Sequence, residues 1–238
     1  WLLQNGLTQT HQNNMGAFGG PDIITDGLVF LVDAASARSY PGSGNTWYDL
    51  SGNNYDLTLT NGPVWNSAGY FDNDVDSYFT GAGGSNIPTG NDPYTMVVWA
   101  RQPNSWGLSG GFIAIGGFGV TNGSNALRTL NSSTGQFHHY WWGNDLSLTS
   151  NAGGIVAGEW FQVAASFDGT TRRIWVNGVS RSSDTPTGHN VTSTTIQVSM
   201  TYPGEYQVGD MAIACIYDRA LTSAEIQQNY NAQKNRFI

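Results

Sequence analysis

Three aspartates at alternating positions form the strongest candidate for chemistry in the sequence. Asp72, Asp74 and Asp76 lie in the segment FDNDVDSYF, at residues 71–79. Carboxylates that converge from one loop or strand edge repel one another unless a cation lies between them, and hard oxygen ligands suit Ca²⁺. The segment therefore predicts a calcium site, although its spacing does not match an EF-hand loop. The competing interpretation is a solvated acidic loop in an acidic protein.

A second candidate site is aromatic. In QFHHYWW, residues 136–142, strand alternation places His138, Tyr140 and Trp142 on one face. Trp106, in a loop that contains Gly and Ser, is a further candidate. Exposed aromatic rings stack against sugar rings, so these residues predict a glycan-binding site. The alternative is that most of the nine Trp pack in the core or between strands, because each buries a large area.

The sequence lacks the residue sets that catalysis needs, and the chain is predicted not to be an enzyme. Glycoside hydrolysis usually needs two carboxylates about 5–9.5 Å apart. The chain's only glutamates are Glu159, Glu205 and Glu225, and none lies within a few residues of another. No phosphate-binding glycine loop occurs.

The charge balance and the short apolar runs exclude two classes of partner. The formal net charge is −8, and only 11% of the residues are charged, against about 25% in ordinary soluble domains. A nucleic-acid-binding protein needs a basic stripe, and Arg172–Arg173 is the only adjacent basic pair. No apolar run approaches the ~18 residues of a membrane-spanning helix. Neither nucleic acid nor a membrane is expected as a partner.

The first twenty residues, WLLQNGLTQTHQNNMGAFGG, differ from the rest of the chain. They show no sustained hydrophobic period and end in Gly-Gly, so residues 1–20 are predicted to be an arm or linker before a domain at 21–238. Trp1, Leu2 and Leu3 form an apolar tip. We expect this tip to dock on the domain or on a neighbouring subunit.

The remaining residues have the pattern of strands. Short apolar or alternating runs are separated by Gly, Asn and Pro turns, which predicts an all-β sandwich or barrel. In YTMVVWARQ (94–102), Met96, Val98 and Ala100 share one face and Val97, Trp99 and Arg101 the other. One helix is expected near the C-terminus, where Thr222 and Glu225 form a capping box and Ile226 and Tyr230 share a face.

One hairpin carries a family resemblance. WFQVAASFDG (160–169) alternates with Phe161, Val163, Ala165 and Phe167 as a core face, while Arg173 and Trp175 are candidate surface contacts before the Asn177-Gly178 turn. This pattern resembles the laminin-G-like, concanavalin-A-like jelly-roll domains. Three further segments, at 26–54, 69–79 and 216–230, agree in the expected order. The resemblance implies a jelly-roll β-sandwich with one short C-terminal helix, and calcium at a sheet rim is common in such domains.

Two functions follow as hypotheses. The opening of the domain resembles versions carried by phage virion proteins, which implies a capsid decoration or fibre component in a virion. Such a structural or adhesive protein would form an oligomer or array through its N-terminal arm. The alternative is a secreted or cell-surface lectin-like module that binds glycans, with calcium as its candidate cofactor. The fold alone does not decide between these two functions.

Overall fold

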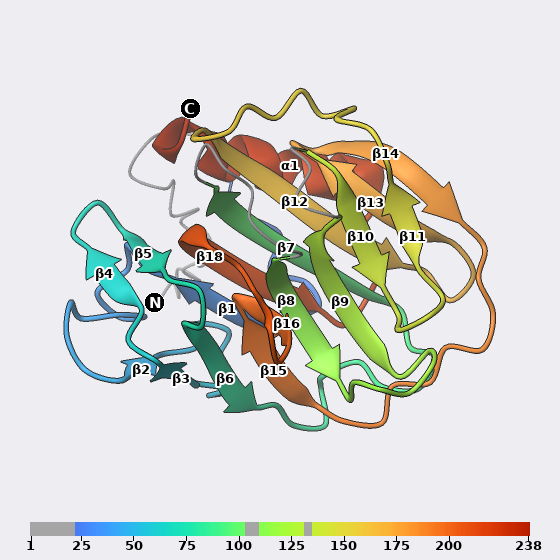
Figure 1. Cartoon of the computed structure of the whole chain (residues 1–238), viewed down its shortest axis with the longest axis horizontal. Coiled ribbons are helices and arrows are strands. Elements are labelled where there is room, and N and C mark those ends of the chain that lie inside the picture. The colour runs from blue at the N-terminus through green and yellow to red at the C-terminus, as the bar shows by residue number, and fades with distance from the viewer. Residues whose placement is uncertain (1–21, 103–109, 131–134) are drawn as a thin grey trace, which may run out of the picture.

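Alternating apolar side chains build two sheets that face each other across a hydrophobic core. The computed structural model describes residues 22–102, 110–130 and 135–238. Figure 1 shows the sheets as two stacked layers, with the helix at one border of the sandwich. This architecture confirms the predicted jelly-roll sandwich. The predicted arm, with Trp1, Leu2 and Leu3, lies outside the described residues, and the boundary at residue 20 stays a prediction.

The first layer is an eight-stranded sheet. Strand β18 is central to it, because its start pairs with β5, its second half pairs with β1, and β7 runs along its other side. The order across the sheet is β14 (Val179–Asp184), β13 (Arg172–Val176), β12 (Trp160–Phe167), β7 (Tyr94–Arg101), β18 (Gly209–Tyr217), β5 (Tyr70–Asn73) and β4 (Val64–Asn66), with β1 (Leu28–Asp33) on β18.

The second layer is a ten-stranded sheet. Strands β16 (Met200–Tyr202) and β17 (Glu205–Tyr206) form a short hairpin that joins it through β8. The order of the other strands is β11 (Leu146–Leu148), β10 (Phe137–Tyr140), β9 (Ser124–Thr129), β8 (Gly111–Gly116), β15 (Thr195–Val198), β6 (Tyr78–Ala82), β3 (Leu57–Thr60) and β2 (Thr46–Trp47).

The core between the sheets uses the predicted faces. Met96, Val98 and Ala100 of β7 belong to the main buried cluster, as predicted. The predicted core face of β12 lies in the same cluster, which comprises Phe161, Val163, Ala165 and Phe167. The Asn177-Gly178 turn between β13 and β14 has positive φ at both residues, 49° and 79°. Asn and Gly tolerate that left-handed conformation better than other residues, so this turn sequence suits the hairpin.

The outer face of the eight-stranded sheet is covered by helix α1 (Ser223–Gln233) and the 3-10 turn η1 (Lys234–Arg236). The helix begins at the predicted Thr222–Glu225 capping box. Trp99 of β7 stacks on Tyr230 and Phe237, with ring centroids 5.7 and 4.4 Å apart. The sequence interpretation of Trp175 as a surface contact is wrong. Trp175 packs in the same covered layer as Ile226, and its indole N–H donates to the Ser166 hydroxyl.

Part of the ten-stranded sheet keeps the alternation of a sheet with one wetter face. Strands β3 and β15 alternate buried residues with more exposed ones, whereas β8 is buried throughout and β7 of the other sheet is buried at every position before Arg101. A strand that is covered on both faces loses the alternating pattern. Three of the predicted ligand residues, His138, Tyr140 and Trp142, lie together on the outer face of the ten-stranded sheet. In the part of the chain that the structure describes, no helix is long and apolar enough to cross a membrane.

Candidate functional site

Strand alternation divides the aromatic segment Phe137–Trp142 between two faces. His138, Tyr140 and Trp142 share the outer face, as predicted, while His139 and Trp141 are fully buried. The outer face beside Tyr140 is floored by small side chains, because Tyr140 pairs with Ala126, and Ala126 pairs with Ala114 of β8. A floor of alanines leaves room for large rings to lie above it.

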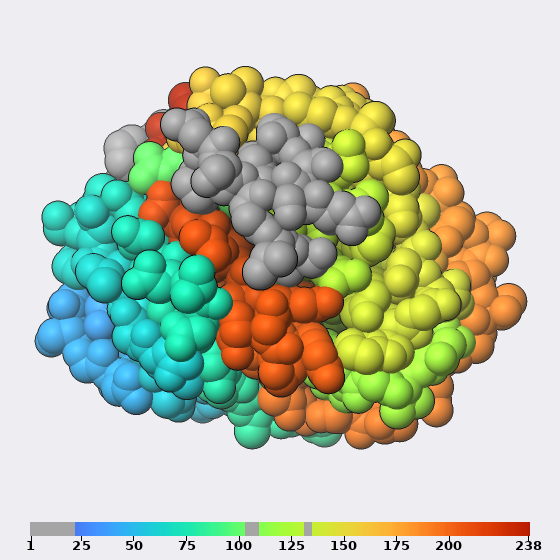
Figure 2. Space-filling model, viewed as in Figure 1, coloured from blue at the N-terminus to red at the C-terminus, as the bar shows by residue number. Residues whose placement is uncertain are grey.

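Four rings on this outer face form what we call the aromatic cluster: Phe118, Tyr140, Trp142 and Tyr202. Trp142 is its centre, with ring centroids 5.6 Å from Tyr140, 4.9 Å from Tyr202 and 6.2 Å from Phe118. Tyr140 is 9% exposed, whereas Tyr202 is 40% exposed, so the cluster runs from a buried base to a solvated edge. In Figure 2 the orange segment near residue 200 lies beside the yellow-green segment near residue 140, on the same face of the molecule.

Trp142 has an unusual backbone. Its φ is 65°, in the left-handed region that a bulky side chain rarely adopts, and Gly143 follows with a φ of 79°. The surrounding turn holds this conformation. The Trp142 carbonyl accepts a hydrogen bond from the Asn122 N–H at 3.4 Å, and the Asp145 carboxylate accepts one from the Trp141 N–H at 2.9 Å. Strained backbone conformations of this kind cluster at binding sites and active sites, where they fix the position of a side chain.

Polar groups converge beside the aromatic cluster. The Arg128 guanidinium lies over the Tyr140 ring, 4.2 Å from its centroid, and donates to the Glu205 carboxylate. Thr201 also donates to Glu205, at 2.9 Å. Arg128 lies 3.4 Å from Nδ1 of His138. Burial, and then the positive charge of Arg128, lower the pKa of His138 to about 4. His138 is therefore neutral at pH 7, and Arg128 is the cation of this site.

Reasoning from the sequence found part of this site. His138, Tyr140 and Trp142 lie together, but Phe118, Tyr202, Arg128 and Glu205 were missed. Phe118 follows β8, and Arg128 pairs with His138 from the preceding strand β9. Tyr202 and Glu205 come from β16 and β17, far along the chain from β10, so no local pattern could reveal them. Trp106, the fourth predicted ligand residue, lies outside the described residues.

The inner face of the same segment forms a buried polar network. The Trp141 indole N–H donates to the Tyr94 hydroxyl at 2.9 Å, and that hydroxyl bonds Nε2 of His139. Nδ1 of His139 lies 3.2 Å from the Arg173 carbonyl, so this nitrogen carries the proton and donates. Burial and the positive charge of Arg172 hold the pKa of His139 well below its usual value. This network stabilises the fold and has no access to a ligand, since His139 and Trp141 are fully buried.

Arg172 belongs to the same buried network and packs against the Trp141 ring. Its guanidinium is 4.3 Å from the Trp141 ring centroid and is fully buried. It donates to Asp184 at 3.1 and 2.7 Å and to the Asn144 carbonyl at 2.7 Å. The His189 ring stacks on the Trp141 ring, with centroids 3.8 Å apart. Burial and Arg172 lower the pKa of His189 to about 4.

The structure separates the three aspartates of the predicted calcium site. Asp72 is on β5, and Asp74 begins the turn that leads to β6. That turn, closed by a hydrogen bond from the Ser77 N–H to the Asp74 carbonyl at 3.3 Å, directs Asp76 toward Asn61, whose amide is 3.4 Å from its carboxylate. Among the described residues, no group of three or more His, Cys, Asp or Glu side chains is placed to hold a metal ion. Calcium binding stays a prediction from the sequence.

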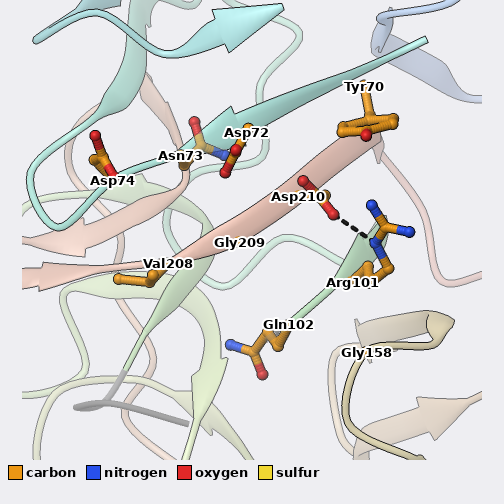
Figure 3. A pocket seen from close by; sticks show the side chains of 10 residues that line it. All are labelled: Tyr70, Asp72, Asn73, Asp74, Arg101, Gln102, Gly158, Val208, Gly209 and Asp210. Atoms are coloured by element: carbon orange, nitrogen blue, oxygen red, sulfur yellow. Dashed lines mark hydrogen bonds and ion pairs between the residues drawn. The ribbon is translucent and has the colours of Figure 1, made fainter. Parts of the chain in front are cut away.

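Asp72 and Asp74 instead line a pocket of about 460 Å³ at one rim of the sandwich, which we call the rim pocket. Strands of the eight-stranded sheet start or end here, and Figure 3 shows side chains from β5, β7 and β18 around the same space. Arg101 donates to Asp210 at 2.5 Å and lies 5.2 Å from the Tyr70 ring centroid. The lining residues are Tyr70, Asp72, Asn73, Asp74, Arg101, Gln102, Gly158, Val208, Gly209 and Asp210.

Comparisons with solved structures agree with the fold. The binding domain of paraclostridial mosquitocidal protein 1 superposes with a TM-score of 0.64 at 15% identity, over 89% of this chain and 53% of that one. Trypanosoma rangeli sialidase in complex with sialic acid has a TM-score of 0.64 at 15% identity, over 89% of this chain and 34% of that one. The receptor binding domain of botulinum neurotoxin C/D mosaic serotype has a TM-score of 0.60 at 16% identity, over 88% and 52%.

These likenesses show the fold alone, because the sequences are so different. The chain spans about half the length of the two toxin fragments and about one third of the sialidase. No curated protein matches the chain in sequence. A laminin G family model, described as "Concanavalin A-like lectin/glucanases superfamily", matches residues 72–227, which is more than half of the chain. The chain therefore belongs to the laminin-G group of the concanavalin A-like lectin/glucanase superfamily.

Proposed function

We propose that this protein is a glycan-binding module without catalytic activity, and that sugar rings pack on its aromatic cluster. The observation that carries this proposal is Trp142. A turn with a φ of 65° holds its ring beside Tyr202, which is 40% exposed, on the outer face of the ten-stranded sheet. An exposed group of aromatic rings on a rigid sheet is a surface for ligand contact rather than for folding.

The chemistry of the aromatic cluster suits a saccharide. One face of a pyranose ring presents C–H groups, and an aromatic face carries negative charge density that attracts such groups. The hydroxyl groups at the edge of the sugar need donors and acceptors nearby. Glu205 offers carboxylate oxygens, and the Arg128 guanidinium that donates to it lies over the Tyr140 ring. Apolar rings with a few polar groups at their edge are typical of ligand sites.

The comparisons support the class of function only coarsely. Two of the similar structures are binding domains of toxins, and a third is a sialidase solved with sialic acid. Their activities belong to those proteins. The absence of catalysis is part of our proposal, and it rests on the scarcity of glutamates in the chain. Glu205 accepts hydrogen bonds from Arg128 and Thr201, so it acts as an acceptor at this site.

A glycan array with the full chain tests this proposal. Tyr202→Ala removes a ring of the aromatic cluster, and Tyr48→Ala is its matched control, because Tyr48 is 44% exposed but lies elsewhere. We expect glycan binding by the wild type and by Tyr48→Ala, with a loss of about tenfold in affinity in Tyr202→Ala. Absence of binding by the wild type, or equal loss in both variants, would contradict it. New reducing ends after incubation with a bound polysaccharide would refute the non-catalytic part.

We further propose that this module is displayed on a phage virion, as a capsid decoration or fibre protein. The support is in the sequence: the opening of the domain resembles that of virion proteins, and residues 1–20 have the pattern of an assembly arm with an apolar tip at Trp1. Mass spectrometry of purified particles should find the chain, and deletion of residues 1–20 should remove it from them. Particles that incorporate the truncated chain normally would exclude the role of the arm.

A further inference from the structure

The rim pocket shares no residue with the aromatic cluster and has its own chemistry. Its lining contains three carboxylates and one cation. The cation, Arg101, is already engaged with Asp210, whose side chain is 13% exposed. Asp72 and Asp74 are exposed, and neither has a side-chain hydrogen bond or ion pair with the described residues, so two unpaired negative charges lie at the solvated edge of the pocket.

Two buried amides add unused acceptors to the same lining. Gln102 is 4% exposed and Asn73 is 1% exposed, and neither Oε1 of Gln102 nor Oδ1 of Asn73 has a hydrogen-bond partner among the described residues. The orientation of Asn73 follows from its neighbours. Its amide N–H donates to Ser199 at 3.1 Å, and the Ser199 hydroxyl lies 3.4 Å from Oε1 of Gln207, to which it donates. A buried acceptor without a donor costs free energy, so such groups indicate a missing partner.

The missing partner is therefore rich in donors and positively charged. No group of three or more His, Cys, Asp or Glu side chains in the described residues is placed to hold a metal ion, which favours an organic cation. A neutral sugar would leave the two carboxylates uncompensated. An ammonium group has three N–H donors, no acceptor and one positive charge, which matches a lining of carboxylate and amide oxygens.

We propose that the rim pocket binds the ammonium group of an amino sugar, so that a glycan held at this rim is selected for a free amine. The assignment to a sugar, rather than to another amine, rests on the proposed function. The groups that contact the amine are Asp74 and Asp72 at the mouth, with Asn73 between them in the sequence, while Gln102 lies across the pocket (Figure 3). The net charge of −8 favours cationic ligands over anionic ones over the whole surface.

Calorimetric titration of the full chain with glucosamine, N-acetylglucosamine and glucose tests the inference, at about pH 6 where the free amine is protonated. Glucosamine should bind at least about tenfold more tightly than the other two sugars, because hydrogen bonds to a charged group are the strong ones. Asp74→Asn should weaken glucosamine binding by about tenfold. Asp76→Asn is the matched control, since Asp76 lies in the same turn, is exposed, and does not line the pocket.

Each alternative result is informative. Equal binding of the three sugars, equal effects of the two variants, or binding of Ca²⁺ that is lost in Asp74→Asn would overturn the proposal. Binding of N-acetyl-lysine amide as tight as glucosamine would overturn the assignment to an amino sugar. Tyr202→Ala separates the two sites: it should keep glucosamine binding at the rim pocket even though it loses binding at the aromatic cluster. If the array shows no glycan binding but glucosamine binds, only the proposed function fails.

Discussion

Two faces of one short segment show how environment assigns a role to a residue type. The segment Phe137–Trp142 presents one His and one Trp to each side of the ten-stranded sheet. On the inner side, His139 and Trp141 are fully buried and hydrogen-bonded to Tyr94. On the outer side, His138 and Trp142 lie at a partly solvated surface beside Arg128 and Tyr202.

The two sides differ in whether their polar groups have hydrogen-bond partners inside the protein. Both nitrogens of His139 and the indole N–H of Trp141 have partners inside the protein. Burial of these groups stabilises the sandwich because their hydrogen bonds are complete. On the outer side, ring faces meet solvent and Nε of Arg128 has no partner among the described residues. We therefore expect substitutions on the inner side to change the free energy of unfolding, and those on the outer side to change ligand affinity.

The largest effect should come from the inner tryptophan. Trp141→Ala opens a cavity against Phe167 and His189 and leaves the Tyr94 hydroxyl with one donor fewer. The free energy of unfolding should fall by about 3–5 kcal/mol. Urea denaturation followed by tryptophan fluorescence measures it. Trp142→Ala is the control and should cost less than about 1.5 kcal/mol; a larger loss there would mean that the outer ring is also structural.

Acid should act through the inner side as well. The pKa of His189 is lowered to about 4, and that of His139 is lowered well below 6.5, by burial and Arg172. Between those values and about 6.5 the unfolded chain binds more protons than the folded chain, so stability is complete above pH 6.5 and falls as pH falls. Each of these imidazoles should cost about 1.4 kcal/mol per pH unit from pH 6.5 to 5.

Denaturation at pH 7.5, 6.5, 5.75 and 5.0 measures that slope, in a window where most carboxylates remain ionised. Arg172→Met removes the shared positive charge, so its slope should be shallower even if the variant is less stable at pH 7.5. His138→Gln and His139→Gln should each make the slope shallower by a similar amount, because the pKa of His138 is also lowered, to about 4. A slope that is flat in the wild type would show that these histidines do not control acid stability.

Loss of the outer ring should be visible in binding. Trp142→Ala removes the centre of the aromatic cluster, which contacts Tyr140, Tyr202 and Phe118. Affinity for a glycan identified on the array should fall by at least about tenfold, or ~1.4 kcal/mol, as measured by calorimetry. Unchanged affinity in a variant that is folded would place the ligand elsewhere.

The smallest effect concerns the backbone of residue 142. A φ of 65° is strained for any side chain and free for glycine. Trp142→Gly should therefore be more stable than Trp142→Ala by about 1 kcal/mol, the reverse of the usual order in regular structure. Both variants lack the ring, so the comparison isolates the turn. Equal stability of the two variants would show that the turn relaxes once the indole is removed.

Much of the fold follows from local pattern. Alternation in 94–102 and 160–167 assigned the core faces correctly, and the capping box at Thr222 located the helix. These features depend on residues within a few positions of one another. The role of Trp175 was misassigned because its outward face is covered by residues that follow it by about fifty positions. Whether an outward strand face meets water depends on what docks against it, which alternation does not encode.

The sequence by itself determined the sandwich, its turns, and the side of β10 to which each aromatic ring points. Only the tertiary structure decided that the outer face of the ten-stranded sheet is the one with partly exposed rings, because α1 covers the other sheet. Cross-strand packing brought Tyr202 to Trp142 and Glu205 to Arg128. The turn after Asp74 separated Asp76 from Asp72 and so dispersed an acidic motif that looked continuous along the chain. Strand alternation is local, whereas sites are made by contacts between residues far apart in sequence.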